Sequence, residues 1–253
     1  MRVLSLGWGV QSFTLAVMSA LGDVEPLNYA IHADTLHEQK ATYDFAQRFT
    51  PWLAEHGVKV VTVQNPTGGF WEVTKRIGQT HVPAFTLNVH GDTGQLNRSC
   101  THRWKIVPIR RWLQANRNGE PVEQWIGIST DEALRMKPSD VRYVTHRWPL
   151  IERRMSRDDC VNYLLSHGLE IPPKSACSFC PFHDTAEWRR IQASADDWRE
   201  AVAVDEHLRK LRPPYDLFIH PSRKPLAAVD LRTAEQKGQY RLWDDECTGI
   251  CGV

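Results

Sequence analysis

The sequence predicts an α/β fold: a doubly wound, mostly parallel sheet followed by a cysteine-bearing C-terminal extension. Three short apolar runs, at residues 3–6, 29–33 and 58–63, alternate with stretches of helical pattern at 12–21 and 38–56. Strand–helix alternation of this kind is typical of parallel sheets, whose crossover helices cover the faces. The 253 residues are enough for one large domain, and 42% hydrophobic with 24% charged residues is ordinary for a globular protein.

A glycine turn joins the first strand to the first helix. Gly7 and Gly9 supply a tight turn, Ser12 opens the helix and Gly22 ends it. Free N–H groups and the helix dipole at such a helix start favour an anion, most often a phosphate. The alternative is an ordinary tight turn, since the stretch matches neither a Walker P-loop nor the three-glycine dinucleotide fingerprint. The candidate nucleotide-binding residues here are Ser5, Gly7, Trp8, Gly9, Val10, Gln11 and Ser12.

Two further strand ends are expected beside this turn. Asp34 and Thr35 follow the second strand, and residues 130–132 follow a strand at 123–129. Ligands of doubly wound sheets bind beyond the carboxyl ends of the strands, so these residues should share one rim with the glycine turn. The alternative for Asp34 is a plain helix N-cap.

The remaining segments are less regular. Residues 64–99 are rich in loop signals and predict a substrate-covering loop. Ser156 to His167 reads as a helix with Ser156 as its N-cap, and residues 187–211 read as mostly helical. From about residue 213 the chain reads as irregular. Strand–helix alternation ends near residue 150, which suggests a division into residues 1–150 and an extension of residues 151–253.

Charge and hydropathy exclude some classes of protein. The net charge of +1 gives no global field for nucleic acid or membrane. No apolar run reaches the roughly 18 residues of a membrane span, and the N-terminal run does not resemble a signal peptide. The expected location is the cytoplasm, with no membrane partner.

Cysteine usage indicates metal or redox chemistry. Six cysteines in a reducing compartment are poor candidates for structural disulfides. Cys177 and Cys180 form a C-x-x-C, whose short arc points two thiolates at one metal or cluster. Cys247 and Cys251 lie within seven residues of the C-terminus.

The order of these motifs resembles the phosphoadenylyl-sulfate (PAPS) reductase family, in the adenine-nucleotide α-hydrolase-like superfamily of PP-loop ATP pyrophosphatases. The resemblance covers the chain nearly end to end. It rests on residues 7–12 in place of the pyrophosphatase loop S-G-G-x-D-S, residues 33–35 with Glu38, residues 100–108, Gly127 to Ser129 with Glu132 and Arg135, residues 148–150, Cys177 to Pro181, and Glu246 with Cys247. It implies that residues 1–150 bind an adenine nucleotide, ATP with Mg²⁺ or PAPS.

The chain departs from the family pattern at three places. Gln11 replaces the aspartate of the pyrophosphatase loop, Ser99 replaces one of two paired cysteines, and the tail has Cys251 besides Cys247. The first departure puts cleavage of ATP through a metal-bound pyrophosphate in doubt. The second removes one expected cluster ligand.

The resemblance implies a cluster held by Cys100, Cys177 and Cys180, with Cys160 as a candidate fourth ligand. Four thiolates suit a [4Fe–4S] cluster or Zn²⁺ equally well on spacing, and the resemblance favours iron–sulfur. With three ligands one iron stays open and could hold a sulfide. The alternative for Cys160 is a buried helix cysteine. His183 reads as an ordinary loop histidine.

The other site residues follow from the same resemblance. Cys247 is the candidate catalytic thiol, which could attack the substrate or accept sulfur, and Cys251 could be the second thiol that resolves the product on Cys247. The alternative is a tail with incidental cysteines. Trp8 could stack on a base or on a partner strand, whereas Trp104, Trp112, Trp125 and Trp148 read as core. Candidate cations for phosphate or sulfate are Lys105, Arg135, Arg98, Arg103, Arg110 and Arg111.

Two enzymatic mechanisms and one non-catalytic role remain open. In the first, ATP adenylylates a substrate oxygen and sulfur replaces AMP, with tRNA or DNA as the acceptor. In the second, Cys247 attacks PAPS or adenylyl sulfate (APS), and sulfite is released. The third is a subunit that binds ATP and signals to a partner. The expected partners are the nucleotide, a tRNA or DNA acceptor, a sulfur donor or thiol reductant protein, and a second copy in a homodimer.

Overall fold

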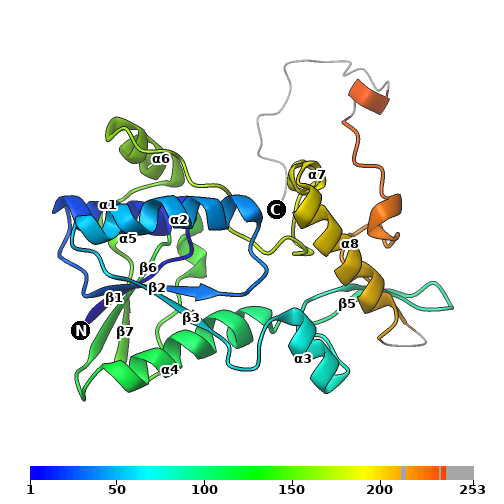
Figure 1. The fold of residues 1–253 in the computed structure, drawn as a ribbon, viewed down its shortest axis with the longest axis horizontal. Helices are drawn as coiled ribbons and strands as arrows, with labels where there is room; N and C mark the ends of the chain where they lie inside the picture. The colour runs from blue at the N-terminus through cyan, green and yellow to red at the C-terminus, as the bar shows by residue number, and fades with distance from the viewer. Residues whose placement is uncertain (212–214, 234, 238–253) are drawn as a thin grey trace.

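The computed structural model describes residues 1–211, 215–233 and 235–237. Cys247 and Cys251 lie outside these residues. Figure 1 shows a layered α/β body that carries the N-terminus, next to a second group of helices that includes α3, α7 and α8.

The centre of the body is a five-stranded sheet in the order β3-β2-β1-β6-β7, and each neighbouring pair is parallel. The fold class that the sequence predicts is confirmed. Since β2 and β6 flank β1, the chain leaves the first strand in one direction and later returns on its other side. A crevice opens at such a reversal, beyond the carboxyl ends of the strands. The strands are β1 (Arg2–Ser5), β2 (Tyr29–Asp34), β3 (Val60–Gln64), β6 (Val122–Ile126) and β7 (Val144–Arg147).

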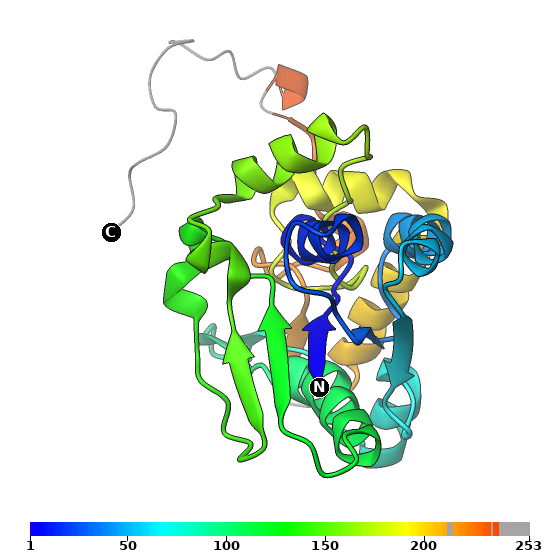
Figure 2. The same cartoon turned by 90° about the vertical axis from the view of Figure 1, so that its left-hand side faces the viewer.

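Helices cover both faces of this sheet. Figure 2 shows α1 (Val10–Leu21) and α2 (Lys40–Glu55) on one face and α4 (Val107–Asn116) on the other. The short α5 (Pro149–Glu152) and α6 (Arg157–Ser166) lie on the side of α1, and α6 packs against it. One core therefore lies between the sheet and α1, around Phe13, Phe45 and Trp125. A second lies under α4, around Ile31, Leu113 and Val144.

A further core holds the rest of the chain together. It joins α3 (Phe70–Ile77), α7 (Thr185–Ala193), α8 (Ala195–Arg209) and a small antiparallel sheet in the order β5-β4-β8. Its strands are β4 (Phe85–Leu87), β5 (Thr93–Gln95) and β8 (Asp216–Phe218). Short helices η3 (Leu226–Ala228) and η4 (Glu235–Lys237) follow. Among the described residues, no helix combines the length and the apolar character needed to cross a membrane.

Two expectations about irregular segments are wrong. Residues 64–99 contain α3 and the β4–β5 hairpin, and the segment after residue 213 contributes β8. Strands of three residues carry no measurable periodicity. β4 and β5 pair as a short hairpin and β8 pairs with β4 from a distant part of the chain, and sequence pattern misses strands this short.

The starts of helices α6 and α1 agree more closely with the sequence-based expectation. The helix expected from Ser156 is α6, and Ser156 caps it: its Oγ accepts a hydrogen bond from Asp159 N–H, while the Asp159 side chain accepts one from Ser156 N–H. The first helix starts at Val10, two residues earlier than expected, because the carbonyl of Gly9 already accepts Phe13 N–H at 2.9 Å.

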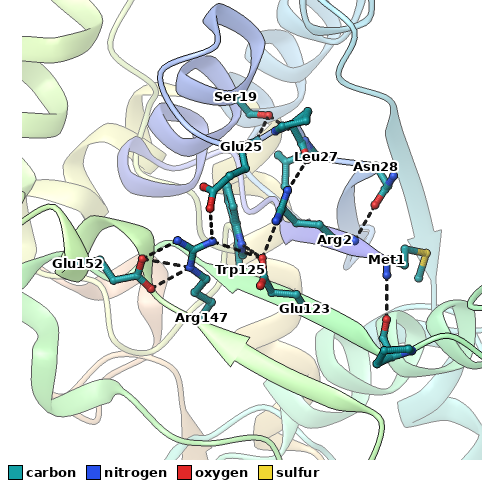
Figure 3. Close-up of polar contacts among 12 residues, drawn as sticks. Met1, Arg2, Ser19, Glu25, Leu27, Asn28, Glu123, Trp125, Arg147 and Glu152 are labelled. Atoms are coloured by element: carbon teal, nitrogen blue, oxygen red, sulfur yellow. Dashed lines mark hydrogen bonds and ion pairs between the residues drawn. The ribbon is translucent and has the colours of Figure 1, made fainter.

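A charged network ties the sheet to its flanking segments (Figure 3). Arg147 pairs with Glu152 and Glu25, and Arg2 pairs with Glu123. The guanidinium carbons of Arg2 and Arg147 lie 5.6 and 5.5 Å from the centroid of the fully buried Trp125 ring. Such half-exposed ion pairs contribute little individually, so we assign the network mainly to holding Trp125 in place.

Candidate active site

The glycine turn lies at the carboxyl end of β1, where the crevice is expected. Ser12 Oγ accepts a hydrogen bond from Gly7 N–H at 3.1 Å and donates one to the carbonyl of Gly9 at 3.2 Å. These bonds fix the turn. No side chain caps this end of α1 in the described structure, so no capping side chain takes up its first N–H groups, and Val10, Gln11 and Ser12 line a cavity there.

Trp8 lies inside this turn, but it is a core residue. Its side chain is 1% exposed and packs against Phe13, His32 and Phe45. The burial leaves no face of the ring for a base, so the expectation that Trp8 stacks on one is wrong. Its backbone has φ of +57°, a strained conformation for a tryptophan. The buried indole holds the turn in that conformation.

Gly127 faces the same turn from β6. A Cβ atom on Gly127 would lie 2.7 Å from the backbone nitrogen of Ser12 and 2.9 Å from its Cα. Only glycine lets the end of β6 approach the start of α1 this closely.

We expect Gly127→Ala to weaken nucleotide binding and to lower the free energy of unfolding by about 1–3 kcal/mol, because backbone atoms must move apart. Urea unfolding and titration with a fluorescent ATP analogue would measure the two effects. Gly7→Ala is the matched control for stability, since a Cβ there meets only Ser12 Oγ at 3.8 Å. An equal loss of stability in both variants would contradict the close-approach argument.

The turn and Gly127 border a polar cavity of about 620 Å³. Four basic side chains line it: Lys105, Arg135, Arg157 and Lys174. Asp131 and Glu132 line it as well, and Arg135 forms an ion pair with Glu132. The remaining lining residues are Gly7, Gly9, Val10, Gln11, Ser12, Gly127, Pro173 and Ser175. The cavity combines free helix N–H groups with cations, which is the chemistry of a phosphate site.

Gln11 connects the two walls of this polar cavity. Its amide nitrogen lies 3.4 Å from both Glu132 Oε2 and Ser129 Oγ, and its amide oxygen accepts a hydrogen bond from Arg157 at 3.2 Å. Arg157 and Lys174 were not among the residues singled out in the sequence. Arg157 reads there only as the first residue of a helix, and Lys174 as part of a proline-rich loop.

A second, largely apolar cavity of about 300 Å³ adjoins the first. It lies between the ends of β1, β2 and β6 and the π-helical turn η1 (His102–Ile106) that leads into α4. Ser5, Gly7, Ile31, Ile106 and Ile109 are among its lining residues. A narrow cavity with apolar walls beside a phosphate site suits a flat aromatic base. No local pattern in the sequence predicts this cavity, because its walls come from β1, β2, β6, β7, η1 and α4.

Asp34 and Thr35 line neither the polar nor the apolar cavity. Asp34 accepts hydrogen bonds from Leu36 N–H, Tyr43 hydroxyl and Gln64 amide, at 2.7–2.9 Å. Burial raises the pKa of Asp34, but these donors outweigh it and hold the pKa below its usual range. Asp34 therefore shapes the turn after β2, and it neither caps α2 nor lines either cavity. Thr35 turns instead toward Cys177, with Oγ1 3.4 Å from Sγ.

A buried ion pair lies at the centre of the site. The side chain of Glu38 is fully buried and accepts a hydrogen bond from Lys105 Nζ at 2.8 Å. Thr35 and Ser175 hydroxyls also approach the carboxylate, each at 3.4 Å. Burial lowers the pKa of Lys105, but Glu38 and the thiols of Cys177 and Cys100 outweigh it and leave the pKa above its ordinary value. Lys105 is therefore a cation at neutral pH.

The third cavity, of about 120 Å³, is lined by the thiol-bearing residues Cys100, Cys177 and Cys180, and we call it the thiol cavity. Cys177 and Cys180 form a turn closed by Cys180 N–H to Cys177 carbonyl at 3.1 Å. Burial raises the pKa of both thiols; Lys105 opposes the shift at both, and Arg98 at Cys180. His183 lies 2.8 Å from the Cys177 carbonyl through Nε2, so it supports the turn.

His37 anchors this turn to the helices behind it. Its Nε2 accepts Phe70 N–H at 2.7 Å, so its Nδ1 carries the proton and donates to Glu200 at 2.6 Å. The other oxygen of Glu200 accepts Ser178 hydroxyl at 2.6 Å, and Ser178 N–H donates to the His37 carbonyl at 2.9 Å. His37 and Glu200 carry no local signal in the sequence, because they are 163 residues apart.

Cys160 lies elsewhere. It is fully buried in α6, within the core that also contains Phe13 and Trp125, and burial raises the pKa of its thiol to about 11. Cys100 and Cys177 pack against the separate core around Phe70 and Trp188. These surroundings are those of a buried helix cysteine, the alternative given for Cys160.

The thiol cavity is the candidate site for a metal or cluster. Within the described residues, no group of three or more His, Cys, Asp or Glu side chains is already gathered as metal ligands. Three thiols nevertheless line one small cavity with Lys105 and Arg98 beside them. This donor set suits a cluster held by three cysteines, and the described chain offers no fourth thiol to it.

Comparisons with known proteins add little to this geometry. No family model matches the chain, and a search of curated proteins finds no match. Among solved structures, it is similar to phosphoadenylyl-sulfate (PAPS) reductase from Candida auris in a phosphate complex. The two share 14% identity over 68% of this chain and 74% of that chain, with a TM-score of 0.47. A likeness this distant carries no argument about activity.

Proposed function

We propose that this protein binds an adenine nucleotide and uses it in sulfur chemistry at the thiol cavity. One observation carries the proposal. Lys105 lines the polar cavity, the apolar cavity and the thiol cavity, and it is the residue that all three share. A ligand that fills the first two therefore ends beside the third.

The nucleotide would lie along the first two cavities. The adenine ring would occupy the apolar cavity over Ile106 and Ile109, and the phosphates would lie at the start of α1. There they would meet free N–H groups, Lys105, Arg157 and Lys174. Asp131 and Glu132 are the carboxylates of this cavity and would hold Mg²⁺, in place of the aspartate that Gln11 replaces.

Cys100, Cys177 and Cys180 would hold an iron–sulfur cluster. With three cysteine ligands, such a cluster would keep one iron without a protein ligand and would supply the sulfur for the transfer. Zn²⁺ is less favoured, because a structural zinc site has four protein ligands. His37 and Glu200 would fix the Cys177–Cys180 turn, and Lys105 would offset the negative charge that three thiolates bring into a buried site.

The reaction that this arrangement supports best is ATP-dependent sulfur transfer to a nucleic acid. An oxygen of the acceptor attacks the α-phosphate of ATP and pyrophosphate leaves. A sulfide-level sulfur would then attack the carbon that bears the adenylylated oxygen, so that a C–S bond forms, the C–O bond breaks and the oxygen leaves with AMP. Lys105 would stabilise the charge that develops at the phosphate, next to the thiol cavity.

A second candidate is reduction of PAPS or APS. Gln11 favours it, because a sulfonucleotide reductase has no pyrophosphate to remove and needs no carboxylate at that position. Its nucleophile would be Cys247, with Cys251 as a second thiol. A non-catalytic ATP sensor would use the same nucleotide cavities without the thiols.

We expect anaerobically purified protein to contain iron and sulfide and to release AMP from radiolabelled ATP only when tRNA or DNA is present. Parallel reactions would contain labelled PAPS and a thiol reductant. Sulfite release in those reactions would contradict the proposed sulfur transfer and would support the reductase function. ATP binding with no turnover in either reaction would favour the sensor, and Cys247→Ser would then have no effect on function.

A further inference from the structure

An exposed aromatic side chain lines the thiol cavity. Phe182 lines this cavity together with Cys180 and Pro181, yet half of its surface (50%) is exposed. Of the large aromatic side chains in the described part of the chain, only Phe182 and Tyr215 are exposed, and Tyr215 lines none of these three cavities. Phe182 thus offers an apolar face to a ligand that approaches the thiols.

An arginine lies over the same ring. The guanidinium carbon of Arg98 is 5.6 Å from the ring centroid of Phe182, and Arg98 also lines the thiol cavity. Its Nη2 donates a hydrogen bond to Thr101 Oγ1 at 2.7 Å, which holds the side chain in place. Among the residues that the structure describes, no carboxylate pairs with Arg98. Its charge is therefore available to an anion.

The two residues lie on the part of the cavity that the nucleotide does not use. Thr101, Lys105 and Ser175 are shared with the nucleotide cavities, whereas Arg98, Pro181 and Phe182 line the thiol cavity alone. A second substrate that enters past Phe182 would reach the thiols without displacing a bound nucleotide. Sulfur transfer needs this arrangement, because acceptor and ATP must be bound together.

We propose that Phe182 and Arg98 form the acceptor subsite, and that the acceptor is a base of a single-stranded nucleic acid. The base stacks on the phenyl ring of Phe182, and a neighbouring phosphate pairs with Arg98. This inference rests on the proposed sulfur-transfer function. A base inside a duplex cannot offer its face to a side chain, whereas an unpaired base can.

The overall charge of the chain agrees with a small contact. Lysines and arginines number 31 against 30 aspartates and glutamates, so no broad cationic surface is available to hold a long duplex. Recognition by one stacked base and one or two phosphates needs no such surface. The stack would then add to the affinity by about the amount of one base–aromatic contact.

The test measures the binding of fluorescein-labelled 12-mers of dT and of U by fluorescence anisotropy, with the full-length, anaerobically purified protein. We expect Phe182→Ala to weaken binding about 10-fold at each salt concentration, the effect of losing one base–aromatic stack. Phe182→Tyr keeps the stack and should bind like the wild type. Tyr215→Ala removes an exposed aromatic ring of similar exposure outside the cavities, and it should leave binding unchanged.

Arg98→Gln separates the phosphate contact from the stack. It should lower the slope of log K against log salt by about one, whereas Phe182→Ala should leave the slope unchanged. Photocrosslinking with 5-iodouracil oligonucleotides, followed by peptide mass spectrometry, should place the crosslink at Phe182.

Equal binding by the wild type and Phe182→Ala, a preference for duplex, or no binding by the wild type would each overturn the subsite. Iron content and ATP affinity, measured on the same preparations, keep the two proposals apart. If both are normal and the stack is absent, only the subsite fails. If the wild type holds neither iron nor ATP, the proposed function fails whatever the oligonucleotides do.

Discussion

Lys105→Met should reduce nucleotide-dependent turnover by about 10²-fold or more, because it removes the one cation that faces all three cavities. The same change leaves the carboxylate of Glu38 fully buried without its partner. Breaking a buried ion pair from one side costs about 3 kcal/mol of unfolding free energy, the low end of the range, since a third of the Lys105 side chain (35%) is exposed. Turnover assays and urea unfolding would measure the two effects.

A double variant separates these effects. Lys105→Met with Glu38→Gln replaces the pair by neutral side chains of similar size, so much of the stability should return. Turnover should not return, because the cation is still missing. If turnover recovered together with stability, Lys105 would be acting only as a structural partner of Glu38, and its catalytic role would be refuted.

Cys177→Ala should abolish the iron and sulfide content of anaerobically purified protein, whereas Cys160→Ala should retain both. Cys177 lines the thiol cavity beside Lys105 and Thr35, while Cys160 packs among core side chains of α1 and α6. Iron and acid-labile sulfide per chain, together with the visible absorption spectrum, would be the measurements. Cys100→Ala and Cys180→Ala should behave like Cys177→Ala.

Cys160→Ala also serves as the stability control. A free buried thiol packs like a small hydrophobe, and its loss should cost about 1 kcal/mol of unfolding free energy. Circular dichroism should show that Cys160→Ala and Cys177→Ala are both folded when their iron content is measured. Loss of iron from Cys160→Ala with an intact fold would make Cys160 a ligand. Full iron content in Cys177→Ala would rule out the three-cysteine site.

Sequence pattern placed the glycine turn and residues 130–132 at neighbouring strand ends, and in the structure the two segments follow β1 and β6 and contribute residues to one cavity. Glycines, capping residues and closely spaced cysteines act within a few residues of one another, so their signals survive in the linear chain. The stacking hypothesis for Trp8 was wrong. Trp8 belongs to the turn by its place in the sequence, but its indole packs against Phe13 and Phe45 in the core. Burial depends on what packs from elsewhere.

The sequence alone determined the α/β class, the order of the first three strands and the two helices between them, and a set of candidate residues for phosphate or a metal. Only the tertiary structure decided which of them meet. It placed Cys160 in a core away from the thiol cavity, brought Glu38 to Lys105 across 67 residues, and tied His37 to Glu200 across 163. Residue type and local spacing fix chemistry and secondary structure. The joining of three cavities at Lys105 depends on long-range packing, which no local pattern in the chain encodes.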